Sequence, residues 1–265
     1  LNPSSAASDV YKRQVIAAGT KPHLRNDIDF TKPNIYYTDI LLTMQELPNS
    51  LVIVGGGIIG MEYASIFSIL GVNVSVIEKR ADVLSLIDRE MRANLTHQLD
   101  IRKVSMFLND GVVDVKTDND NHLITKLESG KAIRSSAIAF CTFRQVCTET
   151  LGLDKIGVKV NQRGQIEVSD AFQTNIENIY AAGDVVGHPA LASTSFEQGQ
   201  IAAQRAFGVQ AKAISKNLPI GIYTIPEISY IGPTEDELTS DKIPYSIGKS
   251  YYKNTSRGAI IGALD

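Results

Sequence analysis

The chain has 265 residues, 43% of them hydrophobic and 21% charged, which is the composition of an ordinary globular protein. Its formal net charge of −3 and its pI near 5.9 give no electrostatic reason to expect a nucleic acid or an anionic membrane as a partner. No apolar run approaches the roughly 18 residues that span a bilayer, and two cysteines are too few for a disulfide-dense secreted scaffold. These features favour a cytoplasmic protein.

The first fourteen residues, LNPSSAASDVYKRQ, have the features of neither a signal peptide nor a transit peptide. They lack the apolar central region that a signal peptide requires. A buried strand is expected to begin abruptly after them, at Val15. Residues 1–14 are therefore interpreted as a non-native or disordered tail and are set aside from the predicted fold.

The clearest motif is G-x-G-x-x-G, formed by Gly55, Gly57 and Gly60. A short, continuous apolar run at residues 51–54 precedes it and is typical of a buried parallel strand. Residues 58–70 follow with the apolar spacing of a helix, and a glycine comes next as a stop signal. The motif therefore joins a predicted strand to a predicted helix.

The next predicted strand, residues 72–77, ends at Glu78, eighteen residues after Gly60. Strand, glycine turn, helix, strand and acid in this order predict a dinucleotide-binding βαβ unit. Gly55 allows the tight turn, Gly57 lets the backbone approach a pyrophosphate, and Gly60 lets the helix lie close to its strand. Glu78 is placed to accept hydrogen bonds from a ribose 2′-hydroxyl.

The choice between NAD and NADP stays open at this point. Glu78 favours NAD, because a carboxylate repels a 2′-phosphate. Lys79 and Arg80 follow at once and would attract that phosphate, unless they form only a solvated loop. A protein that uses both nucleotides would need such a compromise.

A second glycine–acid turn lies further along the chain. Residues 176–186 predict an apolar strand that ends in Gly183 and Asp184, and residues 191–206 predict a helix. Asp184 is suited to accept hydrogen bonds from a phosphate- or ribitol-bearing ligand, or it is simply a turn or helix-capping residue.

Three segments occur in a meaningful order: VIAAGTKP at 15–22, the glycine motif, and TNIENIYAAGD at 174–184. Together they resemble the pyridine nucleotide–disulfide oxidoreductase family of two-dinucleotide flavoproteins, and the resemblance extends over residues 15–265. Three further segments are most similar to the soluble pyridine nucleotide transhydrogenase branch of that family, namely residues 27–48, 61–77 and 219–229.

The resemblance implies an α/β fold in which a Rossmann-like NAD(P) domain is inserted into an FAD domain of three-layer ββα architecture. It also implies an internal fragment that lacks the N-terminal FAD segment and most of an α+β interface domain. Its last residues, RGAIIGALD, are expected to begin a strand of that domain. The implied division is 1–14 tail, 15–34 first FAD segment, 35–144 NAD(P) domain, 145–210 second FAD segment, and 211–265 start of a truncated dimerisation or interface domain.

Site residues follow from the resemblance, position by position. Asp184 would hydrogen-bond the FAD ribityl chain, and Glu62 would lie beside the contact of flavin with nicotinamide, unless it is an ordinary exposed helix residue. The implied NAD(P)-binding residues are Gly55, Gly57, Ile58, Ile59, Gly60, Glu62, Glu78, Lys79 and Arg80. The implied FAD-binding residues are Ala18, Gly19, Thr20, Gly183, Asp184, Leu191 and Ala192.

The resemblance implies an FAD-dependent oxidoreductase that moves hydride between NADPH and NAD+ through the flavin, with FAD, NAD and NADP as cofactors. Nicotinamide dinucleotides are the implied substrates, and the implied parent protein is a homodimer. The alternatives are a dihydrolipoamide dehydrogenase-like disulfide reductase, which a C-x-x-x-x-C pair in an N-terminal segment would mark, and a non-catalytic nucleotide-binding or redox-sensing module. The 265 residues alone are expected to be inactive.

One internal motif departs from the family pattern. Where relatives have A-x-G-R, this chain has Cys141, Thr142, Phe143 and Arg144. Phe143 replaces a glycine, and we expect a backbone conformation there that a bulky residue resists. Neither Cys141 nor Cys147 is predicted to be a redox residue, and the four histidines have no metal-ligand spacing.

Overall fold

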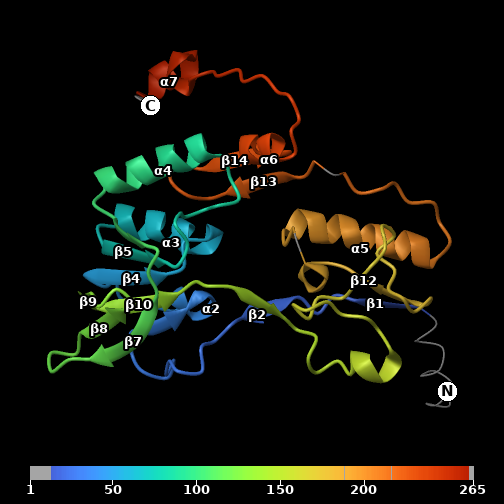
Figure 1. Ribbon diagram of the computed structural model, residues 1–265, viewed down its shortest axis with the longest axis horizontal. Helices are drawn as coiled ribbons and strands as arrows, with labels where there is room; N and C mark the ends of the chain where they lie inside the picture. Colours follow the sequence, from blue (N-terminus) through green and yellow to red (C-terminus); the bar gives the residue numbers. More distant parts are fainter. Residues whose placement is uncertain (1–12, 188, 216, 263–265) are drawn as a thin grey trace. The chain divides into compact units, whose positions relative to one another are not determined.

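The computed structural model describes residues 13–187, 189–215 and 217–262 of the chain. The chain divides into two compact units, of which the first ends at Gly232 and the second begins at Pro233. The first unit holds every sheet that the described residues form (Figure 1). Short helical segments are the regular structure described in the second unit.

The centre of the first unit is a parallel sheet of five strands. In spatial order these are β3 (Ile35–Tyr37), β10 (Ala137–Phe140), β4 (Ser50–Val54), β5 (Asn73–Glu78) and β6 (Ser105–Leu108). The middle strands β10 and β4 are buried along nearly their whole length, as parallel strands covered on both faces are. The parallel sheet with its helices confirms the predicted α/β fold class.

Alternate side chains of the sheet enter two different hydrophobic clusters. Leu51 and Ile53 pack with Met61 of α3 and with Leu95 of α4, in what we call the helix-side cluster. The three helices near the sheet are α2 (Thr38–Leu41), α3 (Ile58–Ile69) and α4 (Arg89–Ile101). Helix α3 therefore lies where the apolar spacing predicts it, directly after the glycine turn.

The other face of the parallel sheet is covered by an antiparallel sheet. Its strands are β7 (Val112–Thr117), β8 (Leu123–Leu127) and β9 (Ala132–Ser135). Val112 and Leu123 share a cluster with Val52 and Ile138 of the parallel sheet. Helices, parallel sheet and antiparallel sheet thus form three layers, and β7 and β8 pair as a hairpin around residues 117–122.

A second parallel pair consists of β1 (Gln14–Ile16) and β12 (Ile179–Ala181), and helix α5 (Ala192–Ala206) contacts both strands. Tyr180 packs with Ile201 and Ala202 of α5, whereas the residues on either side of it in β12 belong to another cluster. Figure 1 shows β1, from the start of the chain, beside β12. The glycine–acid turn thus follows a buried strand, as predicted.

The predicted tail is wrong in its last residue. Gln14 pairs with Ile179 in β1, and Nε of Arg13 donates to the Ala206 carbonyl at 2.9 Å. The strand extends to Gln14 because β12 offers a backbone partner there, which no local sequence signal indicates. Residues 1–12 of the predicted tail lie outside the described residues.

Two short antiparallel strands connect the two parallel sheets. They are β2 (Thr20–Pro22) and β11 (Arg144–Val146), in which Val146 pairs with Thr20. The chain leaves the β1–β12 pair through β2 and returns to it through β11. Along the chain, the strands of the five-stranded sheet therefore come after β2 and before β11, and these two strands pair with each other.

Beyond α5, a hairpin of β13 (Pro219–Ile222) and β14 (Ile228–Ile231) packs on the helix-side cluster. Its loop is held by α3, where Oγ of Ser65 accepts from the Ile225 N–H at 2.7 Å. The described part of the first unit also contains two 3-10 turns, η1 (Leu153–Ile156) and η2 (Asp184–Val186).

The second unit contains α6 (Glu235–Ser240), η3 (Tyr252–Asn254) and α7 (Ser256–Ile261). Thr234 caps α6 in a capping box with Glu237, the arrangement that is typical of a Thr-x-x-Glu sequence at a helix start. The strand expected in RGAIIGALD is wrong, because residues 257–261 belong to α7 and Gly262 forms the turn that ends it. The Thr255 hydroxyl accepts from the Gly258 N–H at 3.0 Å and opens a helix that satisfies its own backbone, whereas a strand requires a neighbour. Residues 263–265 lie outside the described residues.

Candidate functional site

The glycine turn between β4 and α3 is shaped by backbone contacts that exclude side chains. At Gly60 a Cβ atom would lie 1.9 Å from the carbonyl oxygen of Gly55, so the helix can lie this close to its strand only with glycine there. Gly55 has a φ of +117°, and its Cβ would lie 2.5 Å from the Cys141 oxygen. A Cβ at Gly57 would meet nothing within 4 Å. Gly55 and Gly60 thus serve packing, whereas Gly57 adjoins open space.

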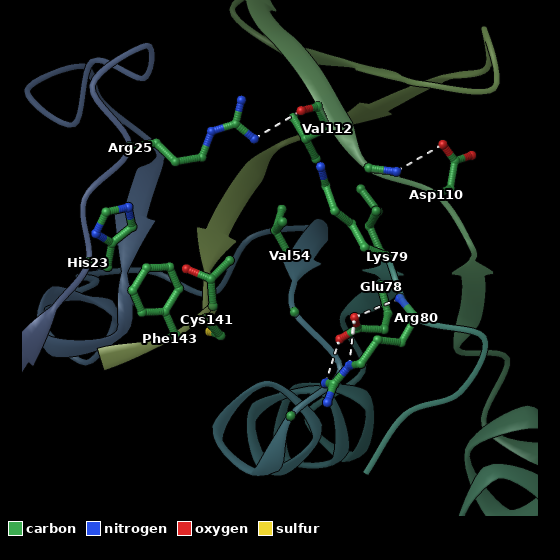
Figure 2. A pocket seen from close by; sticks show the side chains of 15 residues that line it. His23, Arg25, Val54, Glu78, Lys79, Arg80, Asp110, Val112, Cys141 and Phe143 are labelled. Atoms are coloured by element: carbon green, nitrogen blue, oxygen red, sulfur yellow. Dashed lines mark hydrogen bonds and ion pairs between the residues drawn. The ribbon is translucent and has the colours of Figure 1, made fainter. Parts of the chain in front are cut away.

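A cavity of about 700 Å³ lies at the carboxyl ends of β4, β5 and β10 (Figure 2). The chain proceeds from β4 to β5 on one side, while β10 lies on the other side of β4. Such a switch point is where dinucleotides bind in open α/β sheets. Five of the predicted NAD(P) residues line this larger cavity, namely Gly55, Gly57, Glu78, Lys79 and Arg80.

Glu78 ends β5, and its side chain is only 8% exposed. Its Oε2 accepts from the Gly56 N–H at 2.6 Å and from Nη2 of Arg80 at 3.0 Å. Its Oε1 accepts from the Arg80 N–H at 2.9 Å and from Nε of Arg80 at 3.1 Å. Burial favours a higher pKa, but the hydrogen bonds from Arg80 and Gly56 outweigh it and hold the pKa of Glu78 below its ordinary value. Glu78 is thus an ionised carboxylate that ties the glycine turn to Arg80.

Both basic residues after Glu78 are paired. Nζ of Lys79 lies 2.9 Å from Oε1 of Glu128, and Nη1 of Arg80 donates to the Ser85 hydroxyl at 3.0 Å. Their side chains are 68% and 51% exposed, so each can exchange its present partner for a ligand. A 2′-phosphate would compete with Glu128 and Glu78 for these cations.

Four other predicted NAD(P) residues lie away from the larger cavity. Ile58 and Ile59 are partly buried against the helix-side cluster, and Gly60 is buried in the turn. Oε1 of Glu62 accepts from the Tyr223 N–H at 2.8 Å, in the loop between β13 and β14. The first turn of α3 therefore contributes packing side chains, while its backbone N–H groups adjoin the glycine turn.

Sequence reasoning missed part of the cavity wall. His23 and Phe143 stack with ring centroids 4.2 Å apart and an angle of 18° between the rings, and both line the cavity. Arg25 lines it too, and its Nη1 donates to the Val112 carbonyl at 2.9 Å (Figure 2). The one sequence signal was the departure of Phe143 from the family pattern A-x-G-R. No signal indicated His23 or Arg25, because they come from a distant segment of the chain, after β2.

The strained backbone expected at position 143 is not observed. Phe143 is not among the residues with a positive φ. Its carbonyl accepts from the His23 N–H at 3.1 Å, so the pairing of β2 with β11 continues to this residue. A phenylalanine is accommodated because the backbone here is an extension of a strand pair, in which any residue fits.

A smaller cavity of about 260 Å³ lies at the carboxyl ends of β1 and β12. Three of the predicted FAD residues line it, namely Gly19, Gly183 and Asp184. The Gly183 N–H donates to Oε1 of the buried Gln198 at 2.7 Å, which fixes α5 against the turn. The remaining lining residues are Val15, Ala17, Ala182, Ser195 and Gly199.

Thr20, another predicted FAD residue, supports this cavity through Asp184. Its hydroxyl donates to Oδ2 of Asp184 at 3.1 Å and accepts from Nε of Arg144 at 3.0 Å. Nη1 of Arg144 in turn lies 2.8 Å from Oδ1 of Asp39, at the start of α2. This hydrogen bond holds the pKa of Asp39 below its ordinary value. A polar chain thus runs from the smaller cavity to the five-stranded sheet.

The last predicted FAD residues lie outside the cavity lining. Ala18 is exposed, Leu191 packs against the helix-side cluster, and Ala192 opens α5.

Burial raises the pKa of the Cys141 thiol to about 12. Within the described residues, no three His, Cys, Asp or Glu side chains gather as a metal site would require, and no helix has the length and apolarity to cross a membrane.

Comparison with known proteins agrees with this geometry. The family described as pyridine nucleotide-disulphide oxidoreductase matches residues 3–199. A protein of Marinomonas sp. (strain MWYL1) named soluble pyridine nucleotide transhydrogenase is 44% identical over 251 residues, which are 95% of this chain and 54% of that protein. A protein of the same name from Pseudomonas aeruginosa (strain LESB58) is 43% identical over 261 residues, 98% of this chain and 56% of that protein. The chain spans about half the length of these relatives.

Two solved structures have a similar fold. The HOCl-induced flavoprotein disulfide reductase RclA from Escherichia coli, as its Cu(II) complex, has a TM-score of 0.80 and 28% identity, over 86% of this chain and 53% of that one. LpdA from Mycobacterium tuberculosis has a TM-score of 0.81 and 25% identity, over 86% of this chain and 50% of that one.

Proposed function

The chain belongs to the pyridine nucleotide-disulphide oxidoreductase family, and from this premise we propose that its larger cavity binds a nicotinamide dinucleotide and its smaller cavity binds part of an FAD. One observation carries the proposal. The glycine turn and Glu78 lie at the carboxyl ends of adjacent parallel strands and are joined by the 2.6 Å hydrogen bond from Gly56. This is the arrangement that holds a pyrophosphate and its neighbouring ribose in Rossmann folds.

In the larger cavity, the pyrophosphate is proposed to lie against Gly55 and Gly57. The open space beside Gly57 allows a ligand to approach the backbone, and the backbone N–H groups of Ile58 and Ile59 at the start of α3 add partial positive charge. Glu78 accepts from the ribose once a contact with Arg80 opens, since all the favourable positions around its carboxylate are now occupied.

The same pair of residues supports the use of both nucleotides. NAD+ requires Glu78 as an acceptor, whereas NADPH requires a cation for its 2′-phosphate, and Arg80 or Lys79 provides one. In the present arrangement Arg80 is held against Glu78, so a 2′-phosphate draws Arg80 away and a 2′-hydroxyl draws Glu78 away. The site therefore favours neither nucleotide outright.

In the smaller cavity, glycine and alanine residues leave room for an extended, narrow chain at the ends of β1 and β12. Asp184 offers a carboxylate beside this room, and the Thr20 hydroxyl orients one of its oxygens. These residues fit the ribityl portion of FAD. Gly19, Gly183 and the first turn of α5, with Ala192, are proposed to adjoin it, and Ala18 and Leu191 to shape its surroundings.

The proposed reaction is hydride transfer from NADPH to NAD+, as the names of the relatives suggest. Bound FAD supplies a two-electron carrier for it. The pocket of Gly55, Gly57, Gly60 and Glu78 takes each nucleotide in turn, and Glu62 is proposed to lie near the approach to the flavin. We further propose that the whole protein is a cytoplasmic homodimer with the domain division predicted from the sequence, namely 15–34, 35–144, 145–210 and the segment from 211.

A disulfide reductase of the dihydrolipoamide dehydrogenase kind is the second candidate, since RclA is named a flavoprotein disulfide reductase. The buried Cys141 thiol is unsuited to be its redox cysteine, because reactive thiols are partly exposed and have lowered pKa values. A non-catalytic nucleotide-binding or redox-sensing module is a third candidate.

One experiment separates the three candidates. The whole protein that carries this chain is purified, its visible absorbance is recorded, and the reduction of a NAD+ analogue by NADPH is followed beside the reduction of a lipoamide disulfide. Flavin absorbance with transfer between nucleotides is expected. Disulfide reduction alone would favour the second candidate, and a colourless protein would exclude both enzymes.

Nucleotide preference is tested separately on Glu78→Ala. Removing the carboxylate takes away the ribose acceptor and frees Arg80, so the ratio of NADP+ affinity to NAD+ affinity is expected to rise by about tenfold. Lys79→Ala is the matched control, and it should lower that ratio. An unchanged ratio in Glu78→Ala would remove the role given to Glu78.

A further inference from the structure

The larger cavity has an aromatic wall that the family resemblance does not explain. The ring of Phe143 stacks on the ring of His23, with the two centroids 4.2 Å apart. Figure 2 shows these two side chains on one side of the cavity, with Glu78 and Arg80 on the other. The wall and the ribose acceptor therefore line one cavity from opposite sides.

The strand order indicates which half of a dinucleotide this wall would meet. Glu78 ends β5, the glycine turn follows β4, and Phe143 lies just beyond the end of β10, on the opposite side of β4. A dinucleotide with its adenosine ribose at Glu78 and its pyrophosphate at Gly57 extends past β4 toward β10. The half that reaches Phe143 is then the nicotinamide riboside.

The ring of Phe143 is available for a contact. The residue is 60% exposed although its ring stacks on His23, so much of its apolar surface still adjoins open space. His23 is partly buried, and its backbone N–H donates to the Phe143 carbonyl. The two residues are therefore held together by a backbone hydrogen bond as well as by the contact of their rings. A ring fixed in this way loses little conformational freedom when a ligand packs on it.

We propose that Phe143, supported by His23, is a binding residue for the nicotinamide riboside half of the nucleotide. The inference rests on the proposed function of the larger cavity, and it adds a contact that a glycine at this position cannot make. Aromatic contacts of this kind contribute more than apolar area alone, because the ring quadrupoles favour offset-stacked or edge-to-face packing of the nicotinamide on Phe143.

Binding of NAD+ and of ADP to the 265-residue chain, measured by calorimetry, tests the proposal. ADP holds the adenosine and the pyrophosphate but lacks the nicotinamide riboside. Phe143→Ala is expected to weaken NAD+ binding by about fivefold to tenfold and to change ADP binding by less than about twofold. Phe207→Ala removes a phenylalanine that is 80% exposed and is not among the residues that line the cavity, and it should change neither affinity.

Three results would overturn the proposal: equal losses for NAD+ and ADP, no loss for either, or tighter NAD+ binding, which would place the ring in the path of the nucleotide. If circular dichroism shows that Phe143→Ala does not fold, Phe143→Leu is used instead, because leucine keeps the apolar bulk but lacks the ring. Phe143→Leu should still weaken the binding of NAD+ more than that of ADP. A wild-type chain that binds neither NAD+ nor ADP would contradict the proposed nucleotide site itself. If the wild-type chain binds both ligands and Phe143→Ala binds them equally well, only the role of Phe143 is contradicted.

Discussion

The Thr20 hydroxyl donates a 3.1 Å hydrogen bond to Oδ2 of Asp184, which lies 164 positions further along the chain. Arg144 donates to that hydroxyl and also pairs with Asp39. The carboxylate of the smaller cavity is therefore oriented by residues of β2 and β11, the two strands through which the chain enters and leaves the five-stranded sheet. A rigid β2–β11 pair would keep the larger and the smaller cavity at a fixed position relative to each other.

Arg144→Ala is expected to lower the free energy of unfolding by about 1–3 kcal/mol, because it removes hydrogen bonds to the Thr20 hydroxyl, the Thr20 carbonyl and Asp39. Urea denaturation followed by circular dichroism measures the change. Lys21→Ala is the control on the same strand pair. It removes only an exposed 3.4 Å ion pair with Glu149 and should cost less than about 0.5 kcal/mol. Equal effects of the two substitutions would show that Arg144 is not a structural link.

The glycine turn gives a prediction in which two similar substitutions differ. Gly60→Ala places a Cβ 1.9 Å from the Gly55 carbonyl oxygen and forces α3 away from β4, so the chain should fold poorly or unfold at a much lower temperature. Gly57→Ala meets nothing within 4 Å and should leave thermal stability nearly unchanged while weakening NAD+ binding. Thermal melts and calorimetry measure both properties. Loss of NAD+ affinity without loss of stability in Gly60→Ala would contradict the packing role of Gly60.

Glu78 predicts a pH dependence of stability. Its pKa in the folded chain lies below the ordinary value of 4.5, so the ionised form is favoured by folding. The stabilisation is fully present above pH 4.5 and is lost as the pH falls through the lower, folded pKa. The difference in unfolding free energy between wild type and Glu78→Gln should therefore be constant near neutral pH and shrink below about pH 4.5. A difference that grows with acidity would reverse the assigned sign.

The Cys141 thiol is expected to be inert in the folded chain. It is buried, and burial raises its pKa to about 12, so the thiol stays protonated at pH 8. In Cys147→Ser, where Cys141 is the one remaining cysteine, an aromatic disulfide reagent should react only after urea is added. In Cys141→Ser the partly exposed Cys147 should react without urea. Rapid reaction of folded Cys147→Ser would mean that the β10 end opens readily.

Local patterns were enough to predict the βαβ unit. A continuous apolar run, punctuating glycines and an acid at a fixed interval placed β4, α3, β5 and Glu78 correctly, because each depends on neighbours within a few turns of chain. The capping box at Thr234 and the hairpin near residues 117–122 were predictable for the same reason.

Contacts between distant segments could not be predicted. The stack of His23 with Phe143 joins residues that are 120 positions apart, and Gln14 becomes a strand residue only because Ile179 is beside it. In residues 257–261 the family resemblance implied a strand, yet the Thr255 cap opens a helix. The pairing of Arg80 with Glu78 was missed although the residues are two apart, since it depends on the turn that follows β5.

NAD+ binding to the larger cavity can be followed residue by residue. Amide chemical shifts of the isotopically labelled 265-residue chain are recorded during a titration with NAD+. The largest and saturable changes are expected at the amides of Gly55, Gly56 and Gly57 and at those of Glu78 and Arg80. Changes confined to the smaller cavity around Gly183, or no saturable change up to millimolar NAD+, would contradict it.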